Sequence, residues 1–426
     1  MNDVISYLIG FLLGEDGPAD GPHAVGYTDD PKLFSRYKLV IVPSGFFDEG
    51  VYGTAASLPS LPLGEIDGLP FLFGEAREEQ ADGVTVIYAD LIASAYFLLT
   101  RYEEMVRREV RDVHGRFPGK ESLPYRGGFL HRPLVDEYRA LLRRRLLLPP
   151  TAEGIRSVFL THDVDAPFLY RSFKGFIRSL LDGRGIAPSL RGRFGPAEGD
   201  PFFTFPYIFG LDGRVAVAGA EVYTVFFFKA GGRAAEDKPH YSLRNRDIRR
   251  LIESILERGA VVGLHASYEA GVNPSLIVKE RERLERNAGT AVVFNRHHFL
   301  NSREPEDMDS LEAAGISDDF TLGYADVAGF RLGTCRPVRR INPLTRRLTS
   351  LRLHPLTVMD RTLDDPKYMD LGFNEAVNYC LGLIRETAKA GGELSLLWHN
   401  SSLREDDPDS YHRALYSFLT AQLSSR

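Results

Sequence analysis

The sequence predicts an α/β protein in which a distorted (β/α) barrel, residues 151–426, follows a smaller α/β domain, residues 1–150. Three observations favour this fold class. The second part alternates short apolar segments with helix-like segments, the pattern of parallel strands joined by helices. Several of its apolar segments end in His, Asp or Arg, and polar groups at the carboxyl ends of parallel strands are typical of barrels. Pro149 and Pro150 end the last helix of the first part and mark the boundary.

The first part is expected to hold short buried strands at residues 38–43 and 84–88. Asp90 is placed to cap a helix over residues 91–99, and this helix is apolar on every side and should be buried. A second helix is predicted over residues 134–147. His114 and His131 are isolated in sequence, and we interpret them as loop or surface residues.

The second part gives a longer series of elements. Strands are expected at residues 158–160, 222–228, 260–264, 291–294, 327–331, 352–359 and 394–397. Helices are expected at residues 246–258, 274–287, 305–314, 374–390 and 409–423. Residues 183–201 are rich in Gly, Pro and Arg and predict a long irregular insertion, either disordered or part of a functional rim. An aromatic group follows this insertion: Phe202, Phe203, Phe205, Tyr207 and Phe209. Such rings suit sugar faces, but packing onto the barrel is the simpler interpretation.

Composition excludes several classes of protein. The 426 residues are 43% hydrophobic and 26% charged, as in globular proteins of more than one domain. The net charge of −6 argues against a nucleic-acid partner. Cys335 and Cys380 are the only cysteines, so no disulfide framework is expected. The apolar residues 4–13 follow Asp3 rather than basic residues and are too short to cross a bilayer, which predicts a core strand or helix of a cytoplasmic protein without a membrane span.

Polar side chains follow successive predicted strands. Asp163 and Asp165 come after the first strand of the second part, one residue apart. Two carboxylates in one pocket repel each other unless a cation or a shared proton intervenes, so a metal-assisted hydrolytic site is one interpretation and an Asp-rich turn is the other. The same position after other strands is taken by His265, Arg296, His298, Asp319 and His399. Barrel closure would bring all of these to one mouth.

The order of these groups resembles a known family. The stretches are Thr161-His162-Asp163-Val164-Asp165, His265-Ala266-Ser267-Tyr268, Arg296-His297-His298-Phe299, Asp319-Phe320-Thr321 and Leu397-Trp398-His399. Together they resemble the five motifs of the polysaccharide deacetylase (NodB homology) family over residues 151–426. Residues 1–150, including residues 94–104, resemble the extra amino-terminal domain of a bacterial branch of that family.

The resemblance implies hydrolysis of an acetyl group on an amino sugar or polysaccharide. It implies that Asp163 is the general base, that His399 is the general acid and that Arg296 holds the base in place. It also implies that Asp165 and His265 bind a divalent metal. Three residues would contact the acetylated carbohydrate: Leu397, Trp398 and Asp319.

One position departs from the family pattern. The second motif usually has two His four residues apart, and here the second position is Glu269. The third metal ligand is then Glu269 or His298, or the metal site is weak or absent. The metal implied is zinc, with cobalt, nickel or manganese as alternatives. His162 and His297 are expected to form hydrogen bonds rather than to bind the metal.

Two other functions stay open at this point. The first alternative is a catalytically weak or inactive carbohydrate-binding relative, because Glu269 stands where the family has a metal ligand. The second is a hydrolase of a small amide outside carbohydrate chemistry, because a fold does not fix a substrate.

Overall fold

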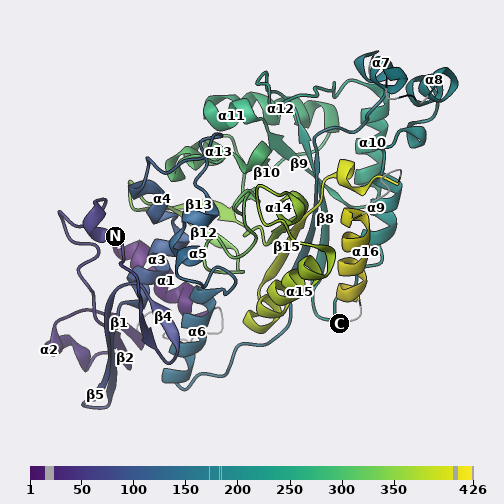
Figure 1. The fold of residues 1–426 in the computed structure, drawn as a ribbon. Helices are drawn as coiled ribbons and strands as arrows, with labels where there is room; N and C mark the ends of the chain where they lie inside the picture. Colours follow the sequence, from purple (N-terminus) through teal and green to yellow (C-terminus); the bar gives the residue numbers. More distant parts are fainter. Residues whose placement is uncertain (15–23, 172, 182, 184, 406–410, 425–426) are drawn as a thin grey trace.

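The computed structural model describes residues 1–14, 24–171, 173–181, 183, 185–405 and 411–424. Its chain forms a mixed α/β structure with a small four-stranded sheet, a large nine-stranded sheet and a two-stranded hairpin (Figure 1). Among the described residues, no helix combines the length and apolar character needed to cross a membrane. The division at residue 150 into two domains stays a prediction.

The small sheet belongs to the first 90 residues. Its strand order is β1-β2-β6-β5, where β1 is Val25–Tyr27, β2 is Leu39–Ile41, β5 is Gly74–Ala81 and β6 is Val84–Ala89. The first three strands are parallel, and β5 is antiparallel to β6. A hairpin of β3 (Gly64–Ile66) and β4 (Leu69–Phe71) lies beside it. The helices of this region are α1 (Asn2–Leu13), α2 (Pro31–Phe34), α3 (Leu91–Leu99), α4 (Tyr102–Val106), α5 (Leu123–Arg126) and α6 (Leu134–Arg145).

Helix α3 confirms the element that the sequence predicts most sharply. The Asp90 carboxylate accepts a hydrogen bond from the Ala93 backbone N–H at 2.9 Å, which satisfies one of the free donors at the helix start. All nine residues of α3 are buried, as expected for a helix that is apolar on every side. The apolar start of the chain is also a core element, helix α1, which packs against α3 and α6.

The large sheet has nine strands in the order β12-β13-β11-β10-β9-β8-β7-β15-β14. Their bounds are β7 Ser157–Val164, β8 Glu221–Lys229, β9 Val261–Ala266, β10 Phe294–His297, β11 Asp318–Asp319, β12 Val338–Asn342, β13 Arg347–Leu353, β14 Val358–Met359 and β15 Glu393–Leu397. Eight of them run parallel, and only β12 is antiparallel to its neighbour. The sheet curls but its hydrogen bonding leaves two edges, β12 and β14, so a full barrel is not shown.

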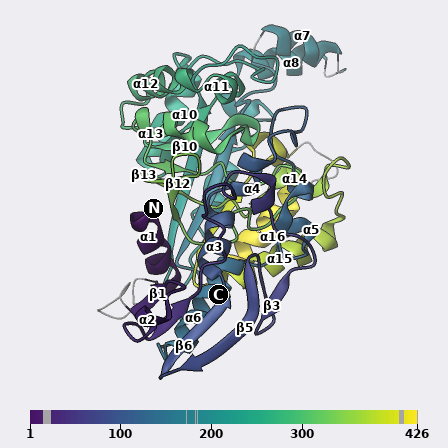
Figure 2. The same ribbon diagram turned by 90° about the vertical axis from the view of Figure 1, so that its left-hand side faces the viewer.

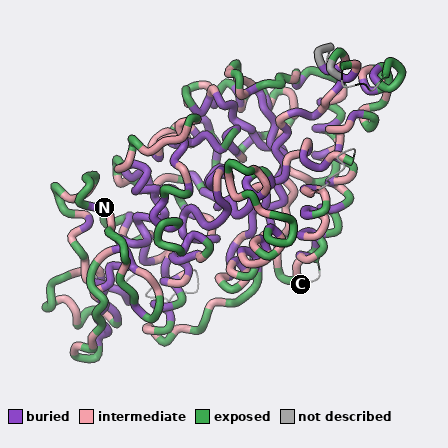
Figure 3. The backbone as a smooth tube through the Cα atoms, viewed as in Figure 1, coloured by how far each residue is buried: buried purple, intermediate pink, exposed green. Residues whose placement is uncertain are grey.

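Helices cover the large sheet (Figure 2). The helices of the second part are α7 (Phe173–Leu181), α8 (Ile186–Phe194), α9 (Phe205–Asp212), α10 (Arg246–Glu257), α11 (Tyr268–Val272), α12 (Ile277–Ala288), α13 (Asp309–Ala313), α14 (Asp360–Asp364), α15 (Phe373–Ala390) and α16 (Tyr411–Ser424), of which α7 and α8 lie away from the sheet (Figure 2). Buried residues are concentrated between the helices and the sheets, while the outer loops are exposed (Figure 3). Phe205 and Phe209 pack against Phe226 of β8, with ring centroids 6.0 and 5.7 Å apart, which confirms the packing interpretation for these two rings.

Several predicted elements were wrong in place or kind. The strand expected at residues 291–294 is β10, Phe294–His297, because its polar residues pair with β9 and β11 and are held inside the sheet. No strand forms at residues 327–331, because backbone N–H groups there bond to two separate segments, Phe330 to Leu130 and Gly329 to Thr357. The strand expected at residues 352–359 is split between β13 and β14.

The predicted irregular insertion at residues 183–201 contains a helix instead. Helix α8 follows Gly185, which has φ of 82°, and Pro188 lies in its first turn, where a missing N–H breaks no helical hydrogen bond. The Ser179 and Ser189 hydroxyls bond at 2.5 Å and join α7 to α8. Figure 1 shows these two helices projecting from one end of the molecule. Sequence positions 172, 182 and 184 of this region lie outside the described residues.

Candidate metal centre

The predicted polar groups lie at the carboxyl ends of four strands among five neighbours in the large sheet. Asp163 lies in β7, and Asp165 comes one residue after that strand. His265 lies in β9, His298 follows β10, and His399 follows β15. Because β15, β7, β8, β9 and β10 are consecutive and parallel, their carboxyl ends meet at one edge of the sheet.

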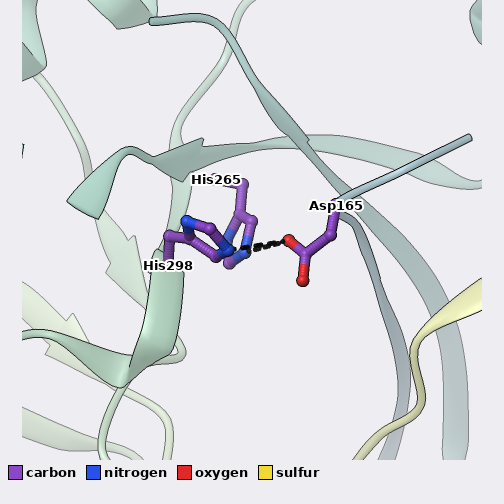
Figure 4. Close-up of side chains that lie close together, drawn as sticks. All are labelled: Asp165, His265 and His298. Atoms are coloured by element: carbon purple, nitrogen blue, oxygen red, sulfur yellow. Dashed lines mark ion pairs between the residues drawn. The ribbon is translucent and has the colours of Figure 1, made fainter. Parts of the chain in front are cut away.

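Three side chains converge at this edge (Figure 4). The Asp165 carboxylate oxygen Oδ1 lies 3.2 Å from His265 Nε2 and 3.3 Å from His298 Nε2. One ligand atom from each residue lies within 4.8 Å of the other two. Two imidazole nitrogens and one carboxylate oxygen at this spacing form a set that can hold a divalent metal ion.

Each histidine is oriented by a partner outside the cluster. His265 Nδ1 donates a hydrogen bond to the Arg296 carbonyl at 2.9 Å. His298 Nδ1 donates to the Asp237 carboxylate at 3.2 Å. Both contacts place the proton on Nδ1 and leave the Nε2 lone pair directed at the cluster. This is the usual arrangement of metal-binding histidines.

Two buried atoms of the cluster lack a hydrogen-bond partner among the described residues. They are Asp165 Oδ1 and His265 Nε2, which face each other without hydrogen-bond geometry. Buried polar atoms without partners are costly, and a cation between them would satisfy both. The residues present therefore fit a metal ion.

The electrostatics of the cluster favour an ionised carboxylate. Burial alone would raise the pKa of Asp165, but His298, His265 and His399 hold this pKa well below its usual value. For His298 the effect of burial has the opposite sign and by itself would lower the pKa. The carboxylates of Asp165 and Asp237 outweigh burial and raise the pKa of His298. Asp165 is thus an anion at neutral pH, as a metal ligand must be.

Asp163 is held beside the cluster by a buried arginine. Arg296 Nη1 donates to Asp163 Oδ1 at 3.0 Å and to the Thr161 hydroxyl at 2.8 Å. Arg296 Nε donates to the Phe320 carbonyl at 3.0 Å, and both charged groups are almost fully buried. The second carboxylate oxygen, Asp163 Oδ2, lies 3.5 Å from His265 Nε2 and so borders the cluster.

His399 lies on another side of Asp165. Its Nδ1 donates to the Asp360 carboxylate at 2.8 Å, and its Nε2 lies 3.6 Å from Asp165 Oδ2. Burial lowers the pKa of His399, but Asp360 and the other carboxylates outweigh it and raise this pKa to about 9. The ring is therefore an imidazolium at neutral pH, with one N–H directed at the cluster.

The residues predicted to contact substrate have different surroundings. Leu397 is buried in a small apolar cluster with Leu300 and Leu356, beside the segment that carries His298. Trp398 packs instead against α16: its ring is 5.1 Å from Tyr416, and its indole N–H donates to the His412 carbonyl.

Asp319 is buried in a polar network below the cluster. Its carboxylate accepts hydrogen bonds from the Asn295 amide at 2.8 Å and from the Thr321 hydroxyl at 2.8 Å. It is therefore placed to order the strands rather than at an open surface. Its role in binding substrate stays a prediction.

The alternative ligand Glu269 lies outside the group of three. Its carboxylate accepts a hydrogen bond from the Arg233 backbone N–H at 2.7 Å. His162 and His297 are also outside: His162 bonds to Asp212 at 2.9 Å, and burial lowers the pKa of His297 to about 4. The geometry thus favours His298 over Glu269 as the third ligand.

Sequence reasoning missed Asp237 and Asp360, the carboxylates that orient His298 and His399. Asp360 follows the apolar pair of β14, so the signal used for the other site residues was present there. Asp237 lies within the connection between β8 and α10 and does not directly follow a strand, so no sequence pattern marked it.

The comparisons with known proteins add little to this geometry. The structure is an α/β fold with three side chains that can hold a metal ion. The first part of the chain, residues 20–148, matches the model of a family of unknown function, DUF7033. A search of curated proteins finds no match. A crystal structure from Mycobacterium smegmatis, described provisionally as a polysaccharide deacetylase, aligns with 65% of this chain and 88% of its own at 16% identity and a TM-score of 0.41. At that score the likeness carries no weight in assigning a function.

Proposed function

We propose that this protein is a metal-dependent hydrolase that removes acetyl groups from an amino sugar or polysaccharide. The observation that supports this most is that Asp163 and His399 both border the group of Asp165, His265 and His298: Asp163 Oδ2 lies 3.5 Å from His265 Nε2, and His399 Nε2 lies 3.6 Å from Asp165 Oδ2. A buried carboxylate and a protonated imidazole that border one metal-binding group are the parts needed for amide hydrolysis.

Asp165, His265 and His298 would hold the metal. When bound, a divalent ion supplies Lewis acidity toward the acetyl carbonyl and lowers the pKa of water beside it. The same donor set also suits zinc, cobalt, nickel, manganese or ferrous iron, so metal analysis of the purified protein identifies the ion.

Asp163 is the general base of the proposal. The contact with Arg296 fixes Oδ1 and leaves Oδ2 toward the cluster, where it takes the proton of the attacking water. His399 is the general acid: Asp360 holds its Nδ1 proton, and Nε2–H is free to protonate the leaving amine. A leaving amine needs this proton because an amide anion is a very poor leaving group.

Acetate release tests the proposal. The full chain, loaded in turn with zinc and cobalt, is incubated with acetylated amino sugars and oligosaccharides, and acetate is measured. Asp163→Asn should lower kcat by about 10²- to 10⁴-fold, the usual contribution of a general base, while metal content stays equal to that of the unsubstituted protein.

Asp29→Asn is the matched control, because Asp29 is an exposed aspartate of the first part. No acetate from any substrate with metal bound would overturn the proposal. If sugars nevertheless bind and Asp163→Asn leaves their affinity unchanged, the protein is a carbohydrate-binding relative. Acetate from simple acetamides alone would identify a small-amide hydrolase.

A further inference from the structure

A cationic cavity of about 410 Å³ opens beside the metal centre. Five of its lining residues carry or can carry positive charge: Lys229, His240, Arg244, Arg283 and Arg286. No aspartate or glutamate lines it among the described residues. The chain has a net charge of −6, so a cavity whose charged lining residues are all basic differs from the average surface of the protein.

Lys229 is the innermost cation of this cavity. It is the last residue of β8 and is only 5% exposed. Its ammonium donates to the carbonyls of Asp237 at 2.9 Å and Pro239 at 3.4 Å and forms no ion pair among the described residues. The carboxylates of Asp165 and Asp237 act on this ammonium from a distance and offset part of its charge. A buried ammonium without a salt-bridge partner among the described residues is stabilised further by an anion that enters the cavity.

The arginines form the outer wall. Arg283 Nη1 donates to the Ala230 carbonyl at 2.6 Å, which fixes this side chain against the end of β8. Arg286 lies 3.6 Å from Glu282, but both side chains are more than half exposed, so this pair is weak. Arg244 is exposed and forms no ion pair in the described part of the chain. Most of the positive charge of the wall is therefore available to a ligand.

Hydrogen bonds link the wall of the cavity to the candidate metal centre. Asp237 accepts from the Lys229 ammonium through its carbonyl and from His298 through its carboxylate. Tyr241 accepts from the Lys229 backbone N–H at 2.7 Å and donates to the Val164 carbonyl at 2.8 Å. Tyr241 and Ser242 also line a second cavity, of about 660 Å³, which begins at Ala166 beside Asp165. The two cavities therefore share part of their wall, and the second begins at the residue that follows Asp165.

We infer that the cationic cavity binds an oxyanion, a phosphate or carboxylate group, carried by the same substrate whose acetyl group reaches the metal centre. This inference rests on the proposed function and narrows the substrate to an acidic acetylated glycan or sugar phosphate. Guanidinium groups donate pairs of charge-assisted hydrogen bonds to such oxyanions, and an ammonium adds a point charge.

Inorganic phosphate is the first probe. Its affinity for the full, zinc-loaded chain is measured by calorimetry for the unsubstituted protein, Arg283→Gln and Arg244→Gln. Each cavity variant should bind phosphate about tenfold more weakly, the effect of losing roughly one charge-assisted hydrogen bond. Arg249→Gln, which removes an exposed arginine of α10 outside the cavity, should bind as the unsubstituted protein does. The inference is overturned if phosphate does not bind, or if Arg283→Gln and Arg244→Gln bind phosphate as tightly as the unsubstituted protein.

Acetate release then separates the sources of the anion. Three substrates are compared: N-acetylglucosamine, its 1-phosphate, and a disaccharide that joins N-acetylglucosamine to glucuronate. Arg283→Gln should raise KM about tenfold for the substrate with the correct anion and leave the neutral sugar unchanged. The substrate that shows this change tells phosphate from carboxylate.

The two proposals fail in different ways. If phosphate binding depends on Arg283 and Arg244 but no sugar releases acetate, the deacetylase assignment falls and the anion site stands. If acetate is released with equal kcat/KM from neutral and charged sugars, and Arg283→Gln changes none of them, the anion site falls and the deacetylase assignment stands.

Discussion

Asp237 is the residue that orients His298, the proposed third metal ligand. Its carboxylate accepts from His298 Nδ1 at 3.2 Å and from the Tyr268 backbone N–H at 2.7 Å. The first contact fixes the ring so that Nε2 faces Asp165. Glu269, at the position where a second histidine was expected, instead bonds to the backbone of Arg233. The two carboxylates are neighbours through the Glu269 N–H, which lies 3.2 Å from Asp237, yet only Asp237 orients a metal-site histidine.

We therefore predict that Asp237→Asn weakens zinc binding by about 10- to 100-fold, as changes to partners of metal-binding histidines usually do. The amide keeps the shape and one acceptor oxygen, so the protein should still fold. Zinc affinity is measured by competition with a chromophoric chelator. Glu269→Gln is the control and should leave the affinity unchanged. If Glu269→Gln weakens zinc binding more than His298→Ala does, Glu269 is the third ligand.

Helices and strands of the molecule differ in how far the sequence could predict them. Helix α3 was predictable because one carboxylate caps it and nearly all of its residues are apolar. Strand β10 was misplaced, because its core residues are Asn295, Arg296 and His297, which become buried only by bonding to neighbouring strands. The local pattern of apolar residues in a sequence predicts which apolar side chains are buried. It does not predict the burial of polar residues whose hydrogen-bond partners are distant in the sequence. The positions of His265 and His399 after apolar strands were readable, whereas the carboxylates behind the site histidines were not identified.

A buried histidine joins two strands that are not neighbours in the large sheet. His354 follows β13 and bonds to Asp318 of β11 at 2.9 Å and to Glu393 of β15 at 2.8 Å. Its ring also stacks on Phe320 at 4.4 Å. Burial by itself would lower the pKa of His354, but the hydrogen bonds to Asp318 and Glu393 outweigh burial and raise this pKa. Burial by itself would raise the pKa of Asp318, but its hydrogen bonds to His354 and Ser317 outweigh burial and lower this pKa to about 2.

A raised histidine pKa sets the sign of the pH dependence. Protonated His354 contributes stability that is fully present below its unfolded pKa of about 6.5 and is lost as pH rises through the higher folded pKa. His354→Gln should therefore destabilise the protein most at about pH 6 and progressively less toward about pH 9. Urea unfolding of both proteins at several pH values measures this difference. A difference in the free energy of unfolding that stays constant with pH would contradict it.

At the scale of the whole molecule, residues 101–116 clamp the segment that follows His298. Arg101 donates to the Ser302 carbonyl at 2.9 Å, and Arg111 pairs with Glu304 at 2.8 Å. Arg116 donates to the Phe299 carbonyl at 2.7 Å. Arg101 also bonds to Glu104, which pairs with Arg331 at 2.8 Å in a buried ion network. Figure 1 shows α4 lying against this side of the large sheet.

The clamped segment has an unusual backbone. Phe299 and Leu300 have φ of 61° and 51°, a left-handed conformation that is uncommon for bulky residues and costs about 1–3 kcal/mol each. Such a conformation persists only where surrounding contacts hold it, and the Arg116 bond to the Phe299 carbonyl is one of them. Because Phe299 directly follows His298, loss of that contact frees the backbone beside the third metal ligand. We therefore expect Arg116, in the first part of the chain, to influence the candidate metal centre through this segment.

This coupling predicts the effect of Arg116→Gln. The His298 ring should lose its fixed position, so zinc affinity should fall by about tenfold, the lower end of what outer partners contribute. The visible absorption of the cobalt-loaded protein should also change, because this spectrum reports the geometry of the ligands. Arg108→Gln is the matched control: Arg108 pairs with Glu304 at 2.9 Å, but its side chain is 43% exposed, and such pairs contribute little. A lower unfolding temperature with unchanged zinc affinity and cobalt spectrum would reduce the Arg116 contact to a structural one and separate the two parts of the chain in function.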